Sequence, residues 1–342
     1  MLRLVGILVT VLFAIATAVL TWPAFFHVER VFPIAQLAAL RGVLVVAFAL
    51  VTIVFLLLAI ARPLRGFALS MALVSAIGAI AGGVVLGVRG YGTESLPDAT
   101  ATSVRVMTWN TAGNAMGAAE IAETAVAMDV DIVALPETSE EVGEQVAVAM
   151  RDMGSPMWVH HVALRPDIAD GPQAWVTTVL ISPDLGDYSV IEASTDLTSN
   201  TEVVPSVVAM PVDGVGPTVV AVHAVSPQPE YMDQWVDDLQ WIADQCAGGD
   251  VILAGDFNAT LDNMAGLGVD GGDLGACVDA AASTGNGAVG TWPTDIPALL
   301  STPIDHVMHS ASWTATGSLV LTNLDDAGSD HRPLVVQLEP AG

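Results

Sequence analysis

The segment 251–260, VILAGDFNAT, carries an acid and an amide directly after a run of apolar residues. Such a run predicts a buried strand, and Gly255 permits a close backbone approach just where the carboxylate begins. Asp256 and Asn258 stand two residues apart, so an extended chain would place both side chains on the same side. This segment therefore delivers one group that can take a proton and another that can donate to a phosphate oxygen.

Other predicted strand ends carry polar residues in the same way. They are Asn110 after residues 104–109, Glu137 after 131–136, His223 after 218–222, Asp305 before 307–308, and Asp330 and His331 before 334–338. Hydrolysis of a phosphate ester needs neutralised oxygens, an activated water and a protonated leaving group, which these residue types can supply. Carboxylate and amide oxygens without a thiolate favour a hard cofactor ion, Mg²⁺ or Mn²⁺.

Together these residues resemble the endonuclease/exonuclease/phosphatase superfamily, whose members share the deoxyribonuclease I-like fold. The resemblance covers about residues 103–340 and rests on the GDFN segment 255–258 and the SDHRP segment 329–333. It implies that Asp256 orients or deprotonates the attacking water and that Asn258 binds the phosphate.

The resemblance also implies roles for the other polar residues. The implied metal ligands are Asn110, Glu137 and Asp330. His223 would contact the phosphate or the leaving group, and Asp305 would fix the tautomer of His331 and raise its basicity. The chain departs from the family pattern at Pro136, where glutamine often precedes the metal glutamate, and at residues 224–225 after the histidine.

Each residue also has a purely structural alternative. Asn110 could form a turn or cap a following helix, and Glu137 could be a first-turn acid with Pro136 at the helix start. His223 could be a structural histidine, and Asp305 could belong to a solvated turn. Their joint occurrence at separate strand ends, in family order, favours the catalytic interpretation.

The first quarter of the chain contains three long apolar stretches. Residues 4–22, 42–61 and 67–88 contain no charged residue, and each has about the 20 residues that a helix needs to cross a bilayer. They predict a transmembrane region over residues 1–88. The first stretch could instead be a cleaved signal peptide, because residues 16–18, Ala-Thr-Ala, form a suitable small-residue site.

Arginines near these stretches bear on orientation. Arg3, Arg62 and Arg65 fall on one side, and Arg30, Arg41 and Arg89 fall on the other, where Glu29 offsets one charge. The numbers are equal, but the tight loop with two arginines and the amino terminus favour the first side as cytoplasmic. We therefore expect a multi-pass protein of the cell membrane with an extracytoplasmic carboxy-terminal domain.

Residues 89–103 contain Gly, Ser, Thr and Pro without periodicity and predict a linker. As a flexible coil of about 15 residues it would reach about 20 Å. Residues 104–342 then form one catalytic domain. Its further expected strands are 157–164, 174–182, 187–194, 203–212, 217–223, 250–254 and 332–338, and its expected helices are 117–128, 139–150 and 230–246. This balance predicts an α/β fold of the α+β type, with two mixed β-sheets packed as a sandwich and flanked by helices.

The charge of the chain bears on its partners. There is no lysine, and from residue 89 onward five arginines stand against 36 acidic residues, a net charge of about −31. Binding of duplex nucleic acid draws on Lys and Arg, and Arg332 is the one arginine adjacent to the predicted site. The charge therefore disfavours duplex nucleic acid and favours a small-molecule or lipid-borne phosphoester, although acidity could also serve solubility or a saline environment.

Two other functions compete with a membrane-anchored phosphoesterase. One is an extracellular nuclease acting on scavenged nucleic acid. The other is a catalytically degenerate domain kept as a membrane-tethered binding module, against which the complete set of catalytic residue types argues. The sequence does not indicate an oligomeric state.

Cys246 and Cys277 flank the GDFN segment. In an oxidising compartment they could pair and close a loop of about 30 residues, stabilising the domain by about 3 to 4 kcal/mol. Two buried thiols are the alternative.

Overall fold

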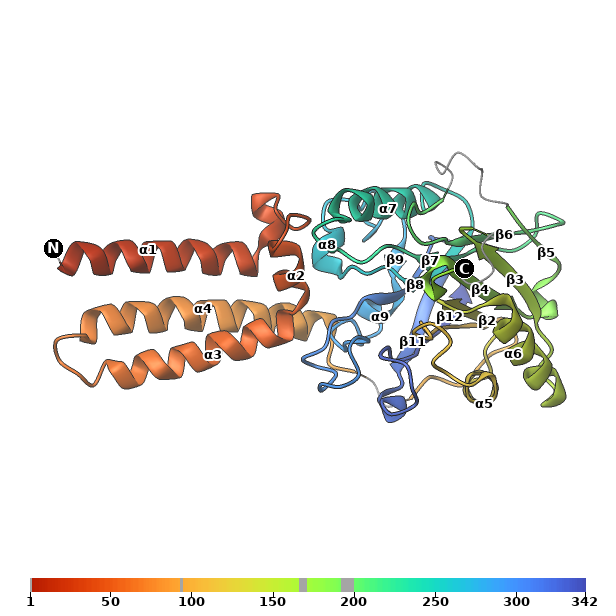
Figure 1. Ribbon diagram of the computed structural model, residues 1–342, viewed down its shortest axis with the longest axis horizontal. Helices are drawn as coiled ribbons and strands as arrows, with labels where there is room; N and C mark the ends of the chain where they lie inside the picture. Colours follow the sequence, from red (N-terminus) through yellow and green to blue (C-terminus); the bar gives the residue numbers. More distant parts are fainter. Residues whose placement is uncertain (1, 93–94, 166–170, 192–199) are drawn as a thin grey trace.

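The structure is a computed structural model that describes residues 2–92, 95–165, 171–191 and 200–342. Three long helices project together from one side of a larger unit that contains all the strands of the described residues (Figure 1).

The three projecting helices are α1 (Leu2–Thr21), α3 (Arg41–Leu58) and α4 (Arg65–Arg89). All three are long and apolar enough to cross a membrane. Helix α4 packs against the other two, and a Cβ at Gly78 would lie only 2.7 Å from the Thr17 side chain. Small residues thus let these helices approach closely. The predicted stretch 42–61 ends earlier than expected, at Leu58, because residues 59–64 form the turn into α4.

The strands form two mixed six-stranded sheets, which confirms the predicted fold class. The first sheet has the order β11 (Trp313–Val320), β12 (Leu334–Pro340), β1 (Val104–Thr108), β2 (Ile132–Pro136), β4 (Val176–Ile181), β3 (Trp158–Ala163). The second has the order β5 (Tyr188–Val190), β6 (Val207–Pro211), β7 (Thr218–His223), β8 (Val251–Asp256), β10 (Asp305–His309), β9 (Val278–Asp279).

The sheets pack face to face around an apolar core. Val106 and Ile132 of the first sheet share one buried cluster with Ile252 and Val307 of the second. On the other face of β8, Leu253 packs in a second cluster, together with residues of α7 (Met232–Gln245). Both faces of β8 are therefore covered, which explains why its sequence is continuously apolar.

Helices cover the outer faces of the sandwich. Helices α5 (Ala118–Ala127) and α6 (Glu140–Asp152) pack in one apolar cluster with residues of the first sheet. The predicted helices 117–128, 139–150 and 230–246 are confirmed as α5, α6 and α7. The short helices that the sequence did not predict are α2 (Ile34–Ala39), α8 (Leu261–Met264), α9 (Ala280–Ser283), and the 3₁₀ turns η1 (Pro23–Phe26), η2 (Gln173–Trp175), η3 (Pro183–Leu185) and η4 (Thr322–Leu324). Elements this short show no readable period.

Several predicted strands are shorter in the structure. The first residues of 174–182 form η2, the stretch 203–212 is regular only in β6, and residues 192–194 of the stretch 187–194 lie outside the described residues. Strand β11 was not predicted, because a bulge between Ala315 and Gly317 breaks its alternation.

The start of the predicted linker is not a free coil. Gly92 N–H donates to the Gly285 carbonyl, and Ala288 N–H donates to the Gly90 carbonyl. Because Gly90 has a φ of 87° and a Cβ there would lie 2.2 Å from the Gly285 oxygen, only glycine fits. The carboxyl end of α4 is therefore joined directly to the domain.

A disulfide links Cys246, at the end of α7, to Cys277, just before β9. The two residues are 31 apart in sequence. The structure thus favours the paired alternative over two free thiols.

Candidate active site

The second sheet places three ionisable side chains in a row. His223 ends β7, Asp256 ends β8 and Asp305 begins β10, and the strand register pairs Asp256 with both of the others. Residues paired across strands project to the same face. A Cβ at Gly255 would lie 1.9 Å from the Val222 carbonyl oxygen, so the glycine is what allows β7 and β8 to bring these groups together.

The first sheet supplies the remaining predicted residues. Asn110 lies just beyond β1, Glu137 follows β2, and Asp330 and His331 precede β12. Strand β1 lies between β2 and β12, so these ends are adjacent. The structure brings the predicted residues together at the meeting point of the two sheets.

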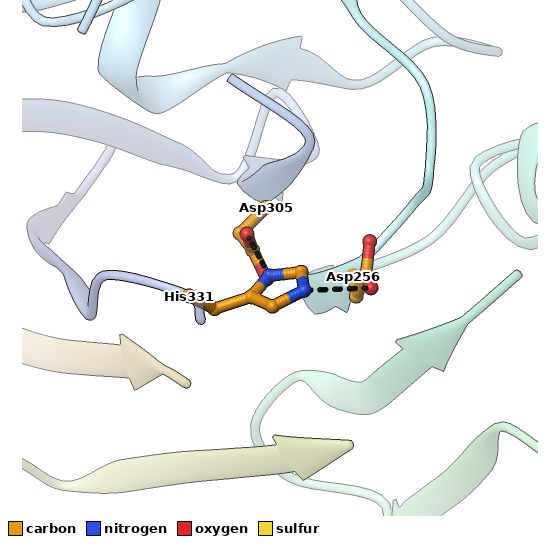
Figure 2. A group of neighbouring side chains, drawn as sticks. All are labelled: Asp256, Asp305 and His331. Atoms are coloured by element: carbon orange, nitrogen blue, oxygen red, sulfur yellow. Dashed lines mark hydrogen bonds and ion pairs between the residues drawn. The ribbon is translucent and has the colours of Figure 1, made fainter. Parts of the chain in front are cut away.

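Asp305 and His331 form a buried pair. His331 Nδ1–H donates to Asp305 Oδ2 at 2.8 Å, and its Nε2 faces Asp256 Oδ2 at 3.9 Å (Figure 2). Burial disfavours the imidazolium, but the charge and hydrogen bond of Asp305 outweigh that cost and raise the pKa of His331 above its usual range. The sequence alternative of a solvated turn at Asp305 is wrong, because Asp305 lies buried in β10.

Asp256 accepts three hydrogen bonds in this cluster. Asn258 N–H donates to Oδ1 at 2.8 Å, and the side-chain amides of Asn110 and Asn258 donate to Oδ2 at 3.0 and 3.2 Å. Burial, followed by repulsion from Asp305, raises the pKa of Asp256 to about 7. An acid with such a pKa can give up and take a proton near neutral pH.

Asn258 supports this acid. Its Nδ2 also donates to the Ala224 carbonyl at 2.9 Å, so both amide hydrogens have protein partners. Its φ of 47° is unusual for a residue other than glycine, and such conformations cluster at functional sites. Binding of phosphate by Asn258 remains a prediction and would require one of these hydrogen bonds to be exchanged.

Asn110 and Glu137 touch each other. Asn110 Nδ2 donates to Glu137 Oε1 at 3.2 Å, while its oxygen accepts from Ala112 N–H at 2.9 Å. Glu137 has a φ of 58°, and α6 begins only at Glu140, so the alternative of a helix start at Pro136 is wrong. A metal role for Asn110 remains a prediction, since its amide would have to turn over to present the oxygen.

His223 is buried, with Nε2 lying 3.8 Å from Glu137 Oε1. Its Nδ1 has no hydrogen-bond partner among the described residues. Burial, with the nearby His331 charge, lowers the pKa of His223 to about 3. The ring is neutral at pH 7 and offers a nitrogen lone pair to the site.

Two sets of residues could hold a metal ion. Asp256, Asp305 and His331 offer ligand atoms that all lie within 4.8 Å of one another. A histidine held protonated by Asp305 is a poor ligand, however, because ligation requires the neutral ring. Glu137 and Asp330 offer carboxylate oxygens, the ligand type that a hard divalent ion prefers, and both side chains are partly open to solvent, but their role as metal ligands remains a prediction.

Trp292 contacts one of the predicted site residues, although nothing in the sequence marked it. Its Nε1–H donates to Asp330 Oδ2 at 2.8 Å, and its ring is partly exposed beside the predicted metal ligands. Thr291 next to it accepts from the backbone N–H of Asp305. The TWP segment 291–293 offered no charge or spacing that marked it as functional.

A second buried pair supports the GDFN segment. His306 Nδ1 lies 2.6 Å from Asp279 Oδ2, and its Nε2 bonds the Ala259 carbonyl at 2.9 Å. His306 had no role in the sequence pattern, and its partner lies 27 residues away. Only the fold shows that His306, paired with Asp279, forms a hydrogen bond to the backbone of Ala259, just beyond Asn258.

Arg332 is not available to substrate. Its guanidinium is fully buried, pairs with Asp325 and donates to four backbone carbonyls. Its position beside the site in sequence therefore does not supply a phosphate contact.

The chain is similar to one protein family and to several solved structures. Residues 107–331 match the model of the endonuclease/exonuclease/phosphatase family, and no curated protein matches the chain. Three similar solved structures each have a TM-score of 0.52. An endonuclease/exonuclease/phosphatase from Beutenbergia cavernae is 17% identical over 70% of this chain and 72% of that one. A family protein from Leptotrichia buccalis (15%) and TDP2 of D. rerio humanised by 14 mutations (16%) cover 69% of this chain and 99% of theirs. At such identities the likeness shows the fold alone.

Asp238 of α7 fixes the chain before β6 and after β7, the strand that carries His223. Its buried carboxylate accepts from Glu202 N–H at 2.8 Å and from Val225 N–H at 2.9 Å. Burial raises the pKa of Asp238 to about 7 in spite of these bonds.

This shift predicts a pH-dependent stability. Between the unfolded pKa of 3.8 and the folded value of about 7, the folded protein holds a proton that the unfolded chain has lost. The contribution of Asp238 is thus fully present below pH 4 and declines by on the order of 4 kcal/mol as pH rises through 7. We expect the difference in unfolding free energy between wild type and Asp238→Asn, measured by urea unfolding, to fall over this range. A difference independent of pH would show that Asp238 is ionised in the fold.

Proposed function

The chain belongs to the endonuclease/exonuclease/phosphatase family, and we propose that it is a membrane-anchored, divalent-metal-dependent phosphoesterase. The observation that carries this proposal is the buried cluster of Asp256, Asp305 and His331 beside Glu137 and Asn110. It combines a carboxylate whose pKa is near neutral with a protonated histidine.

These groups can divide the work of in-line attack by water. Asp256 takes a proton from the attacking water, and Asn110 and Asn258 hold its carboxylate in place. His331, oriented by Asp305, donates from Nε2 to a phosphate oxygen or the leaving group. Glu137 and Asp330 would hold Mg²⁺ or Mn²⁺, which when bound neutralises charge on the phosphate oxygens.

The charge of the domain supports a small or lipid-borne ester over duplex nucleic acid. Arg105 is engaged by Gln337 and by the Met128 and Pro97 carbonyls, and Arg332 is buried. These arginines do not form a basic surface for phosphates on a domain of about −31. If the enzyme instead hydrolysed DNA faster than small or lipid-borne esters, that result would support a nuclease acting on scavenged nucleic acid.

We place the catalytic domain outside the cytoplasm. The amino end of α1 and the connection from α3 to α4 lie remote from the domain (Figure 1), and by sequence these two places contain Arg3, Arg62 and Arg65. At the other end, Glu29 and Asp262 form ion pairs with the three arginines and offset two of their three charges, so the larger excess of positive charge favours the remote end as cytoplasmic. The disulfide in the domain suits the same orientation.

Removal of the proposed base tests the reaction. We expect Asp256→Asn to lower kcat on a generic phosphodiester by about 100-fold or more, because the amide keeps the shape but cannot take a proton. Asp152→Asn, an exposed change at the end of α6, is the matched control. Near wild-type turnover by a folded Asp256→Asn protein would sink the assignment.

Metal titration tests Glu137. Glu137→Gln replaces an anionic oxygen with a neutral one and is expected to raise the Mg²⁺ concentration needed for half-maximal activity. The control is Glu144→Gln, which is exposed on α6. An unchanged titration would remove Glu137 from the metal site.

Proteolysis tests the orientation. Protease added to intact spheroplasts is expected to degrade the carboxy-terminal domain without lysis of the cells. Protection of the domain until lysis would reverse the proposed topology.

A further inference from the structure

We propose that the catalytic domain is fixed directly on the bilayer surface, and that its substrate is a phosphoester lipid of the same bilayer that the helices cross. This inference rests on the proposed function and names its substrate class. It depends on a docking region at the junction in Figure 1, made of residues 21–42, 89–92, 260–265 and 285–301.

One buried carboxylate joins two helices to the domain. Asp262 of α8 receives two hydrogen bonds or ion pairs from Arg41 and two from Arg89, at 2.7 to 2.9 Å. All three side chains are largely buried, and the two guanidinium charges lower the pKa of Asp262 against the effect of burial. Planar bidentate pairs of this kind fix geometry as well as distance.

The same clamp sets the level at which the helices end. Arg41 opens α3, Arg89 closes α4, and Arg41 Nη1 also donates to the carbonyl of Thr21, the last residue of α1. The domain-side ends of all three apolar helices therefore lie around one carboxylate. A bilayer crossed by these helices has its surface at this level.

Further contacts prevent the domain from pivoting. Asn263 donates to the carbonyls of Glu29 and Ala35, and Arg30 donates back to the carbonyls of Asn263 and Ala265. A Cβ at Gly42 would lie 2.0 Å from the Leu299 carbonyl oxygen, so α3 also abuts the loop that carries Trp292.

Exposed aromatic rings lie at the same level. Trp22, Phe25, Phe26 and Phe32 follow the end of α1, and Phe25 is 78% exposed. Trp22, Phe25 and Phe26 continue the apolar surface of α1 into the turn η1. Trp at the end of a span is typical of the lipid head-group zone, and exposed Phe rings beside it are apolar surface that the boundary between head groups and acyl chains covers, so lipid is the occupant we assign to them.

The active site is close to this surface. Asn258 and Asp262 are four residues apart, so the chain between them spans at most about 14 Å. The head-group zone of one leaflet is itself about 5 to 8 Å thick. A lipid phosphate in the same leaflet is thus within reach of a rigidly held site, and no flexible tether is needed.

The test compares lipid in the same bilayer with lipid in another. The full chain is reconstituted in phosphatidylcholine vesicles that contain phosphatidylglycerol and phosphatidic acid, or is mixed with separate vesicles of that composition, with Mg²⁺ present. Bis(4-nitrophenyl) phosphate and 4-nitrophenyl phosphate are the soluble comparators. We expect the lipid in the same bilayer to be hydrolysed about tenfold faster or more, because confinement raises its effective concentration.

Variants separate docking from catalysis. We expect Arg89→Gln to lower the ratio of same-bilayer to soluble turnover about tenfold, by freeing the domain to tilt. Arg65→Gln, at the opposite end of α4, is expected to leave the ratio unchanged. If Arg89→Gln does not fold, Phe25→Ser changes an exposed ring and is expected to lower the same ratio.

The outcomes are distinct. Equal rates on the two vesicle arrangements, or turnover of soluble esters without turnover of either lipid, would overturn this inference and leave the phosphoesterase in place. A ratio unchanged in a folded Arg89→Gln protein, or in Phe25→Ser, would also overturn it. Absence of turnover on every ester would overturn the proposed function itself.

Discussion

Burying Asp256, Asp305 and His331 together is stable only because their charges and hydrogen bonds compensate one another. Two carboxylates face each other across β8 and β10, an arrangement that repulsion alone would disfavour. The imidazolium of His331 and the amide of Asn110 lie beside them and lower that cost. Burial and Asp305 raise the pKa of Asp256, whereas His331 and the hydrogen bonds to the carboxylate lower it. The resulting pKa of about 7 suits proton transfer near neutral pH.

Each of the two sheets of the sandwich supplies some of the residues of the proposed active site. The second sheet contributes Asp256, Asp305 and His223, and the first contributes Asn110, Glu137 and His331. Neither sheet holds a complete site. Packing of the apolar inner faces therefore sets the distances between the groups of the proposed active site, and Glu137 and Asn258 within it have left-handed backbone conformations.

A second compensated carboxylate controls the relation between the domain and its helices. Asp262 accepts from Arg41 and Arg89 in a largely buried setting, where loss of the carboxylate would leave two guanidinium charges close together without a counter-charge. Asp262 lies four residues beyond Asn258, so the GDFN segment and the contact with the helices share one short stretch of chain. Three of the ten arginines in this lysine-free chain, including Arg30, serve this junction, which leaves few for binding polyanions.

The sequence by itself determined the elements that have a strong period or a specific motif. The long apolar stretches, the three larger helices and strand β8 could be predicted because their hydrophobic patterns are long and regular. The GDFN and SDHRP segments likewise indicated the family. The resemblance to that family implied which polar residues lie together in the proposed active site. Strand β11 could not be predicted, because its bulge breaks the pattern that strand prediction depends on.

Only the tertiary structure decided the contacts between residues far apart in the chain. The pairing of Cys246 with Cys277, the support of His306 by Asp279, the burial of Arg332 and the clamp on Asp262 join segments whose separation carries no local signal. The sequence of the linker predicts a free coil, because its contacts with a distant segment leave no local signal. In the structure, its glycines form hydrogen bonds with residues 285–288. The composition of a segment indicates the structure that the segment favours by itself. The residues that it contacts depend on which surfaces the folded core places beside it.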